Sequence, residues 1–212
     1  MTNPDWIETF LPGTSVARDC RDCAALYAEV DGRIADFAAG SGVTCPAGCG
    51  TCCASFDPPV AWVEAELVAM FLLASGRVAP PAPGAACPLF DPVSPYHCTV
   101  YAVRPLICRT FGFTGSTDAN GRLRFAYCRH MPHAAPRTLR GAALRRAFTV
   151  VPPVADVYAR RILARSGQSE EEELTLSRAL TPSMAKIAEL RLLVGEEKKG
   201  GRGVPGPGSE RA

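Results

Sequence analysis

The sequence is poor in lysine and histidine, and it has no long hydrophobic run. Only three residues are lysine, so nearly all of the 23 basic residues are arginines, and the formal net charge is only +2. A charge this close to neutral predicts no strong general attraction to nucleic acid or to a membrane surface. The longest apolar stretch, residues 60–74, is too short to span a bilayer and contains Glu64 and Glu66. We therefore expect no membrane partner.

Familiar catalytic motifs are also missing. The sequence has no G-x-S-x-G turn, no phosphate-binding P-loop and no pair of carboxylates at a suggestive spacing, which leaves enzymatic activity open. Asp57 and Glu64 are expected to be a helix cap and a solvent-facing residue. Residues 1–13 contain acidic side chains and lack the basic start and apolar run of a secretory signal, so a cytoplasmic location is expected.

Cysteine is what the sequence has in excess. Ten cysteines occur in 212 residues, and four of them fall within residues 45–53, which read C-P-A-G-C-G-T-C-C. Thiols at this density either close disulfides or bind a soft metal as thiolates. Disulfide frameworks are typical of small secreted domains that cannot build a core, whereas this chain is 47% hydrophobic. Metal binding is therefore the favoured interpretation.

Eight cysteines are the candidate metal ligands. Cys49 and Cys52 have the C-x2-C spacing that lets two sulfurs converge on one ion, and glycines beside Cys49 permit a tight turn. Thr51 is expected to cap a helix whose positive end faces the thiolates. The full candidate set is Cys45, Cys49, Cys52, Cys53, Cys87, Cys98, Cys108 and Cys128. It suffices for two four-thiolate sites, holding zinc or a [4Fe–4S] cluster, or for one site with spare thiols.

Other residues have alternative roles near these ligands. Cys20 and Cys23 lie one turn apart in a predicted helix, where we expect them to pack rather than to bind metal. His97 and His130 could replace a cysteine as ligand or donate to one. The arginines that follow Cys108 and Cys128 would either offset the negative charge of metal thiolates or be solvated at the surface.

The predicted fold class is α-rich, a small α+β domain whose irregular, metal-tethered cysteine core is packed by flanking helices. One short β-hairpin is expected over residues 111–125, and a helix over 61–74 is expected to open at Asp57 or Pro59. One domain is predicted over residues 1–194. It comprises a helical segment at 15–39, the cysteine core at 45–133 and helices over 137–194, and a disordered tail follows at 195–212.

The C-terminal helices carry further expectations. A basic helical stretch is predicted over 137–167 with a break at Pro152 and Pro153. The last helix is expected to open at the glutamate run 170–173, to be interrupted at Pro182 and to end near Val194. A Pro-rich loop is predicted over 77–86.

A wider pattern surrounds the cysteines and resembles a known family. It reads Cys45-x3-Cys49-Gly-x-Cys52-Cys53, then Cys87-Pro-Leu, then Cys98-x2-Tyr101-x2-Arg104-Pro105-x2-Cys108-Arg109, and then Cys128. Over residues 45–133 this pattern resembles the YkgJ-type cysteine-cluster family, which is described as zinc- or iron-chelating. The resemblance implies metal chelation by these cysteines and supplies no reaction.

Three functions remain in view. The first is a metal-binding protein that holds an iron–sulfur cluster or zinc, and we favour the cluster because Cys52 and Cys53 are adjacent and the ligands are dispersed. A similar cysteine pattern in flagellin lysine N-methylases implies the alternative of an iron–sulfur-dependent redox or protein-modifying enzyme. A zinc-stabilised nucleic-acid binder using the arginines of 137–165 ranks third, because that stretch has few aromatics for stacking. No protein partner or substrate is predicted.

Overall fold

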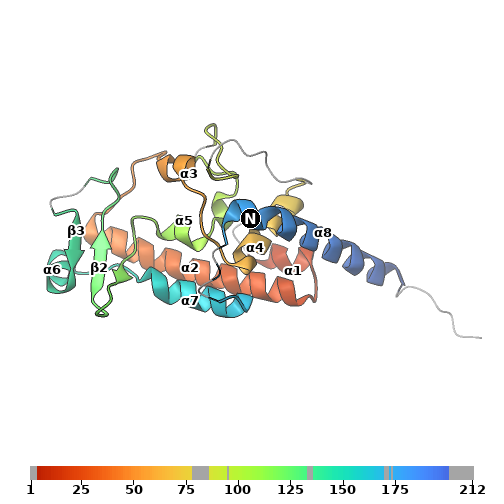
Figure 1. Cartoon of the computed structure of the whole chain (residues 1–212). Coiled ribbons are helices and arrows are strands. Elements are labelled where there is room, and N and C mark those ends of the chain that lie inside the picture. The colour runs from red at the N-terminus through yellow and green to blue at the C-terminus, as the bar shows by residue number, and fades with distance from the viewer. Residues whose placement is uncertain are drawn as a thin grey trace, which may run out of the picture.

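Helices form most of the structure, and a small antiparallel sheet lies at one end (Figure 1). The computed structural model describes residues 4–77, 86–94, 96–132, 136–169, 172 and 174–200. The predicted α-rich class with a small β component is confirmed. The predicted loop at 77–86 lies almost entirely outside the described residues. The disordered tail predicted over 195–212 is wrong for residues 195–200, which form the end of the last helix, and its remainder lies outside the described residues.

The longest helix near the N-terminus, α2 (Ser15–Ser41), forms the base of the fold. It begins after Thr14, whose hydroxyl accepts a hydrogen bond from the Ala17 N–H at 3.1 Å. It ends at Gly42, whose φ of +70° is the left-handed conformation that glycine adopts at helix ends. The helix predicted over 15–39 is confirmed. Helices α1 (Asp5–Phe10) and α7 (Ala155–Ser166) pack against α2.

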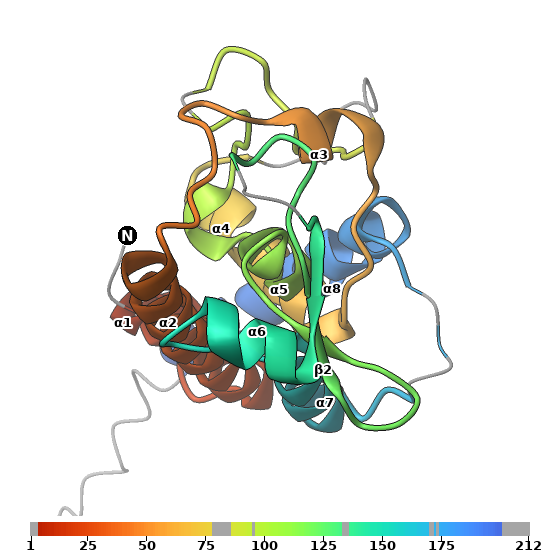
Figure 2. The ribbon, with the colours of Figure 1, turned by 90° about the vertical axis from the view of Figure 1, so that its left-hand side faces the viewer.

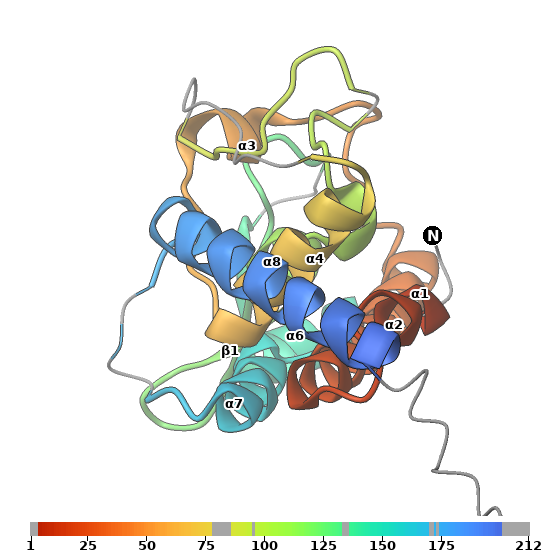
Figure 3. The same ribbon diagram turned by 90° about the vertical axis from the view of Figure 1, so that its right-hand side faces the viewer.

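Helix α4 (Trp62–Ala74) lies at the centre of the main core. It packs against α2 and against α8 (Leu176–Gly200), and its apolar residues face its neighbours on all sides. Cys20 and Cys23 are fully buried in this core, as predicted. The cysteine-bearing loops and α3 (Thr51–Ser55) lie above α4 and α5 (Leu106–Thr110), on the opposite side of the molecule from α7 (Figure 2 and Figure 3).

The sheet closes a second, smaller apolar cluster. Strands β1 (Ser116–Thr117), β2 (Leu123–Ala126) and β3 (Thr138–Arg140) pair antiparallel in that order, and α6 (Gly141–Ala147) follows β3. Phe37 from the end of α2 meets Phe125 of β2 and Phe148 edge to face, with ring centroids 5.3 Å and 5.1 Å away. This contact joins the sheet to the far end of α2.

The predicted hairpin is partly wrong. Phe111–Phe113 was predicted as its first strand, but this segment is the turn after α5, where Gly112 has a φ of +80°. The first strand instead starts at Ser116, and a third strand over Thr138–Arg140 replaces the start of the predicted helical stretch. The predicted break at Pro152 and Pro153 is present, because it separates α6 from α7.

Two helix starts also differ from prediction. Neither Asp57 nor Pro59 opens α4, because the first N–H groups of this helix meet other partners. Asp57 instead accepts a hydrogen bond from the Ser177 N–H at 3.1 Å, at the start of α8. Helix α8 begins at Leu176 rather than in the glutamate run, passes Pro182 without a break and extends beyond Val194 to Gly200.

Glu64 is a buried carboxylate that joins three elements. It accepts hydrogen bonds from the backbone N–H of Ala61 at 2.8 Å, the backbone N–H of Leu106 at 2.7 Å and the Tyr27 hydroxyl at 2.8 Å. The prediction of a solvent-facing Glu64 is wrong, since the residue is only 5% exposed. Desolvation raises the pKa of Glu64, and the three donors and Arg109 oppose that rise. These donors make the burial of the carboxylate tolerable.

No helix in the described part of the chain is both long enough and apolar enough to cross a bilayer. This agrees with the sequence, in which charged residues interrupt the longest apolar stretch.

We predict that Glu64→Gln lowers the free energy of unfolding by about 1–3 kcal/mol, because the glutamine amide would face the Ala61 N–H and leave a buried donor unsatisfied. Chemical denaturation followed by circular dichroism measures the change. Glu29→Gln is the matched control, since Glu29 is an exposed acid paired with Arg161 and its loss should have a much smaller effect. Equal losses in the two variants would contradict the role of Glu64.

Candidate metal centre

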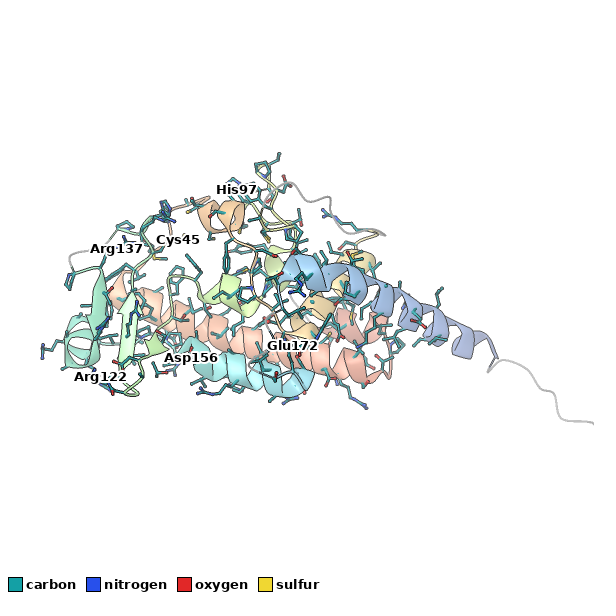
Figure 4. The ribbon with its side chains drawn as sticks, viewed as in Figure 1. Cys45, His97, Arg122, Arg137, Asp156 and Glu172 are labelled. Atoms are coloured by element: carbon teal, nitrogen blue, oxygen red, sulfur yellow. The ribbon has the colours of Figure 1, made fainter. Side chains whose placement is uncertain are left out.

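The eight candidate cysteines line one cavity of about 650 Å³, although they come from separate parts of the chain. Cys45 and Cys49 lie in the loop before α3, Cys52 and Cys53 lie in α3, and the others follow in two later loops, in α5 and after β2. Cys45 is exposed, Cys87 is buried and the other six are partly buried. Figure 4 shows Cys45 and His97 on the upper side of the molecule, where α3 lies. The cavity therefore presents thiols to solvent-accessible space.

Local turns position the first cluster of thiols. The Cys49 N–H donates to the Pro46 carbonyl at 3.1 Å, and Gly48 completes the turn with a φ of +68°. The residue before α3 is Gly50, so the prediction that Thr51 caps this helix is wrong: Thr51 is the first helical residue. Its hydroxyl instead lies 3.6 Å from the Cys49 sulfur.

A close approach of two loops brings the next cysteines to the same cavity. The Cα of Gly50 lies against His97, and a Cβ at position 50 would be only 2.4 Å from the His97 Cβ. The loop that carries His97 is itself held by a β-bridge between Phe90 and Cys98. Glycine at position 50 is therefore required for this contact between the two cysteine-bearing loops.

Helix α5 carries Cys108 and is fixed from below. Its first N–H, that of Leu106, donates to Glu64, and the following Arg109 is 6% exposed. Arg109 donates to Asp31 of α2 at 2.5 Å, and its guanidinium carbon lies 4.2 Å from the centre of the Tyr27 ring. Arg109 also donates to two backbone carbonyls and to no sulfur. The predicted solvated position is therefore wrong for Arg109, and its other predicted role, offsetting the charge of metal thiolates, stays a prediction.

The thiols differ in acidity because their surroundings differ. The Sγ atoms of Cys52 and Cys53 lie 3.9 Å apart. The Cys53 thiol stabilises the Cys52 thiolate, which lowers the pKa of Cys52 to about 6, and the same pairing raises the pKa of Cys53. Hydrogen bonding from Thr51 lowers the pKa of Cys49, whereas desolvation raises the pKa of Cys108. Without metal, Cys49 and Cys52 are therefore the more acidic thiols, whereas desolvation raises the pKa of Cys45 to about 11.

The histidines lie at the edge of this arrangement. The Nδ1 atom of His97 is buried and has no hydrogen-bond partner among the described residues, and its ring stacks on Phe90 with centroids 5.9 Å apart. His130 is exposed and lines the cavity. His133 lies outside the described residues. A ligand role for either described histidine stays a prediction.

The donor set suits a soft metal, although the described side chains do not converge on a single point. Among the described residues, no group of three or more histidine, cysteine or acidic side chains is close enough to hold one ion. All eight thiols nevertheless face one cavity, and thiolates are the protein ligands that select zinc and iron–sulfur clusters. The residues present therefore fit a thiolate-bound metal centre by their chemistry, and the ligand geometry stays undefined.

The sequence patterns did not predict the residues that support this site. Tyr27, Asp31 and Glu64 line no part of the cavity, yet together they hold α5 beneath it. One signal was available, since Glu64 is an acid inside an otherwise apolar run. Its partners lie 37 and 42 residues away in sequence, and no local pattern identifies them.

Comparison with known proteins supports metal chelation. Residues 44–131 match the protein-family model CxxCxxCC, described as "Putative zinc- or iron-chelating domain". The matched segment contains all eight candidate cysteines, and the predicted resemblance to a cysteine-cluster family is confirmed over it. No match was found among curated proteins or among solved structures. The match leaves the choice between zinc and iron open.

We predict that iodoacetamide labels Cys52 of the metal-free protein before the other cysteines at pH 7. A pKa of about 6 leaves this side chain mostly as the nucleophilic thiolate at that pH, and labelling should slow as the pH falls below about 6. Timed labelling followed by peptide mass spectrometry measures the order.

Cys20 and Cys23 provide the internal control for this experiment. Both are fully buried, so they should react only after unfolding. Labelling of either one before Cys52 in the folded protein would contradict the arrangement described.

Proposed function

We propose that this protein binds an iron–sulfur cluster in the cysteine-lined cavity. The observation that carries the proposal is that eight thiols from distant parts of the chain line one cavity. The match to a zinc- or iron-chelating family model over the same residues supports metal binding there. A bound cluster would supply electron-transfer or Lewis-acid chemistry at this position.

The spacing of the donors favours a cluster over a single ion. A cubane binds each thiolate at a different iron, so its four protein sulfurs lie further apart than four sulfurs around one zinc ion. The thiols here surround a cavity instead of converging on one point, as far as the described residues extend. A polynuclear centre can therefore be reached by four of these sulfurs with less movement of the loops.

The acidity of two thiols favours metal binding by Cys49 and Cys52. The Cys52 thiol is already acidic, so it loses its proton to a metal at little cost near neutral pH. We assign Cys49 and Cys52 to the ligand set on these grounds.

Zinc is the second candidate. The C-x2-C spacing of Cys49 and Cys52 is one that zinc sites use, and eight thiols suffice for two four-thiolate zinc ions. A zinc centre would be structural, because four protein ligands leave no open position for a substrate.

Anaerobic purification distinguishes the two metals. We predict a brown protein that absorbs visible light and contains iron and acid-labile sulfide in equal amounts. Absorption spectra with iron, sulfide and zinc analysis provide the measurement. A colourless protein with stoichiometric zinc after anaerobic handling would refute the cluster and leave a structural zinc site.

We predict that Cys49→Ala and Cys52→Ala each remove most of the bound metal and lower the melting temperature. The reason is that binding of a structural metal contributes to the folding free energy, on the order of 10 kcal/mol for zinc in small domains. Cys20→Ala is the matched control, since Cys20 packs in the core and should leave metal content unchanged. Full metal occupancy in both ligand variants would contradict the assignment.

A further inference from the structure

The cavity that the thiols line is also lined by positive charge. Four arginines contribute to it, Arg104, Arg109, Arg129 and Arg137, and no aspartate or glutamate does so in the described part of the chain. Arg109 is neutralised by Asp31, and the other three have no ion-pair partner among the described residues. A cavity lined by charges of one sign raises the local concentration of ligands of the opposite sign.

A bound cluster would not neutralise all of the positive charge of these arginines. A [4Fe–4S] core in its usual oxidised state, held by four thiolates, carries a net charge of about −2. Three free arginines therefore exceed it by about one positive charge. The excess favours a further anion in the cavity, and the remaining four cysteines need not supply it, since a thiol is neutral while protonated.

Contacts with Tyr101 hold the Arg104 side chain in place for such a ligand. Its guanidinium carbon lies 3.9 Å from the centre of the Tyr101 ring, and the Tyr96 ring stacks on Tyr101 with centroids 4.1 Å apart. Both groups cannot occupy the same face, so Tyr101 is sandwiched between Arg104 and Tyr96. One guanidinium nitrogen donates to the Tyr101 carbonyl at 2.9 Å, and the other donors remain available. This stacking reduces the entropy that Arg104 would lose on binding an anion.

The other two arginines lie at the sheet end of the cavity. Arg129 and Arg137 are exposed, and neither has an ion-pair partner within the residues described. Figure 4 shows Arg137 on the same side of the molecule as Cys45. Guanidinium groups bind carboxylates and phosphates with paired hydrogen bonds, so these side chains are suited to an oxyanion.

The cavity lining also contains apolar side chains. Phe56 and Phe111 line the cavity with ring centroids 6.4 Å apart, and Leu89 and Val100 lie in the same lining. The volume of about 650 Å³ is within the range of small-molecule sites, about 300–1,000 Å³. The cavity lining thus combines thiols that suit a soft metal, positively charged arginines and apolar side chains.

We infer that the cavity binds a small organic anion beside the metal centre. The ligand carries a carboxylate or phosphate group, which the three free arginines bind, and an apolar body, which packs against the phenylalanines. This inference deepens the proposed function and rests on it in one respect, the positive charge that remains after metal binding. The rival explanation is that the arginines serve only as counter-charges for the metal thiolates.

Calorimetric titration of the metal-loaded protein under anaerobic conditions tests the inference. The probes are benzoate, phenyl phosphate, inorganic phosphate and neutral benzyl alcohol. We expect binding of benzoate or phenyl phosphate, tighter than that of inorganic phosphate, and no binding of benzyl alcohol. The stronger of the two aromatic anions identifies the head group. Failure of both aromatic anions to bind would overturn the inference. Binding of inorganic phosphate as tight as that of the aromatic anions would overturn the role of the apolar side chains.

Arginine variants assign the binding to these residues. Arg129→Gln combined with Arg137→Gln should weaken binding of the anion about tenfold or more while leaving metal content unchanged. Arg104→Gln should do the same, and Arg104→Lys should restore part of the affinity because it keeps the charge. Arg146→Gln is the matched control, since Arg146 is exposed on α6 and lies outside the cavity lining.

The outcomes separate this inference from the proposed function. Wild-type affinity in the cavity variants, with a changed metal spectrum or reduced metal content, would show that the arginines are only counter-charges and would overturn the inference. A wild-type protein that binds no metal would refute the proposed function alone, because the same titration, repeated on the metal-free protein, still measures anion binding by the arginines.

Discussion

The arrangement of the cysteine cavity depends on one buried carboxylate. Glu64 accepts hydrogen bonds from the N–H of Ala61, which precedes α4, from the first N–H of α5 and from the Tyr27 hydroxyl of α2. One of those helices, α5, carries Cys108 into the cavity, and its Arg109 is paired with Asp31 of α2. A buried polar network of this kind stabilises only one arrangement, because each broken hydrogen bond leaves an unsatisfied group. The helical core thus fixes the floor of the cavity, while loops form its upper wall.

A cavity with a fixed helical floor and walls formed by loops suits a metal-binding protein. The loop with Cys45 and Cys49 has few buried apolar residues, whereas the loop with Cys87 and Cys98 packs Leu89 and Val100 into the main core, and the two loops approach closely at Gly50. Metal binding would contribute the stability that the loop with Cys45 and Cys49 gains little of from burial. The arginines of the same lining offset the negative charge that thiolates bring, which reduces the cost of gathering several of them in one place.

The sequence predicted the parts of the structure that follow from local patterns. Helical periodicity located α2 and α4 to within two residues, and cysteine spacing selected the eight residues that line the cavity. Long-range partners could not be predicted: Glu64 was expected in solvent because two of its three donors lie 37 and 42 residues away in sequence. The hairpin was misplaced because Phe111 and Phe113 alternate like a strand, although α5 and the turn at Gly112 take up that segment. Thiol spacing gives ligand candidates, and only a fold determines which of them share a space.

X-ray absorption at the iron and zinc edges of anaerobically purified protein tests the central claim most directly, because it reports the atoms bound to the metal. The account predicts iron surrounded by sulfur alone, with a second scattering shell from neighbouring iron atoms. Iron ligated mainly by oxygen or nitrogen would contradict the claim that the cysteine cavity is the metal site. Zinc with four sulfur neighbours and no iron would keep the site and contradict the cluster.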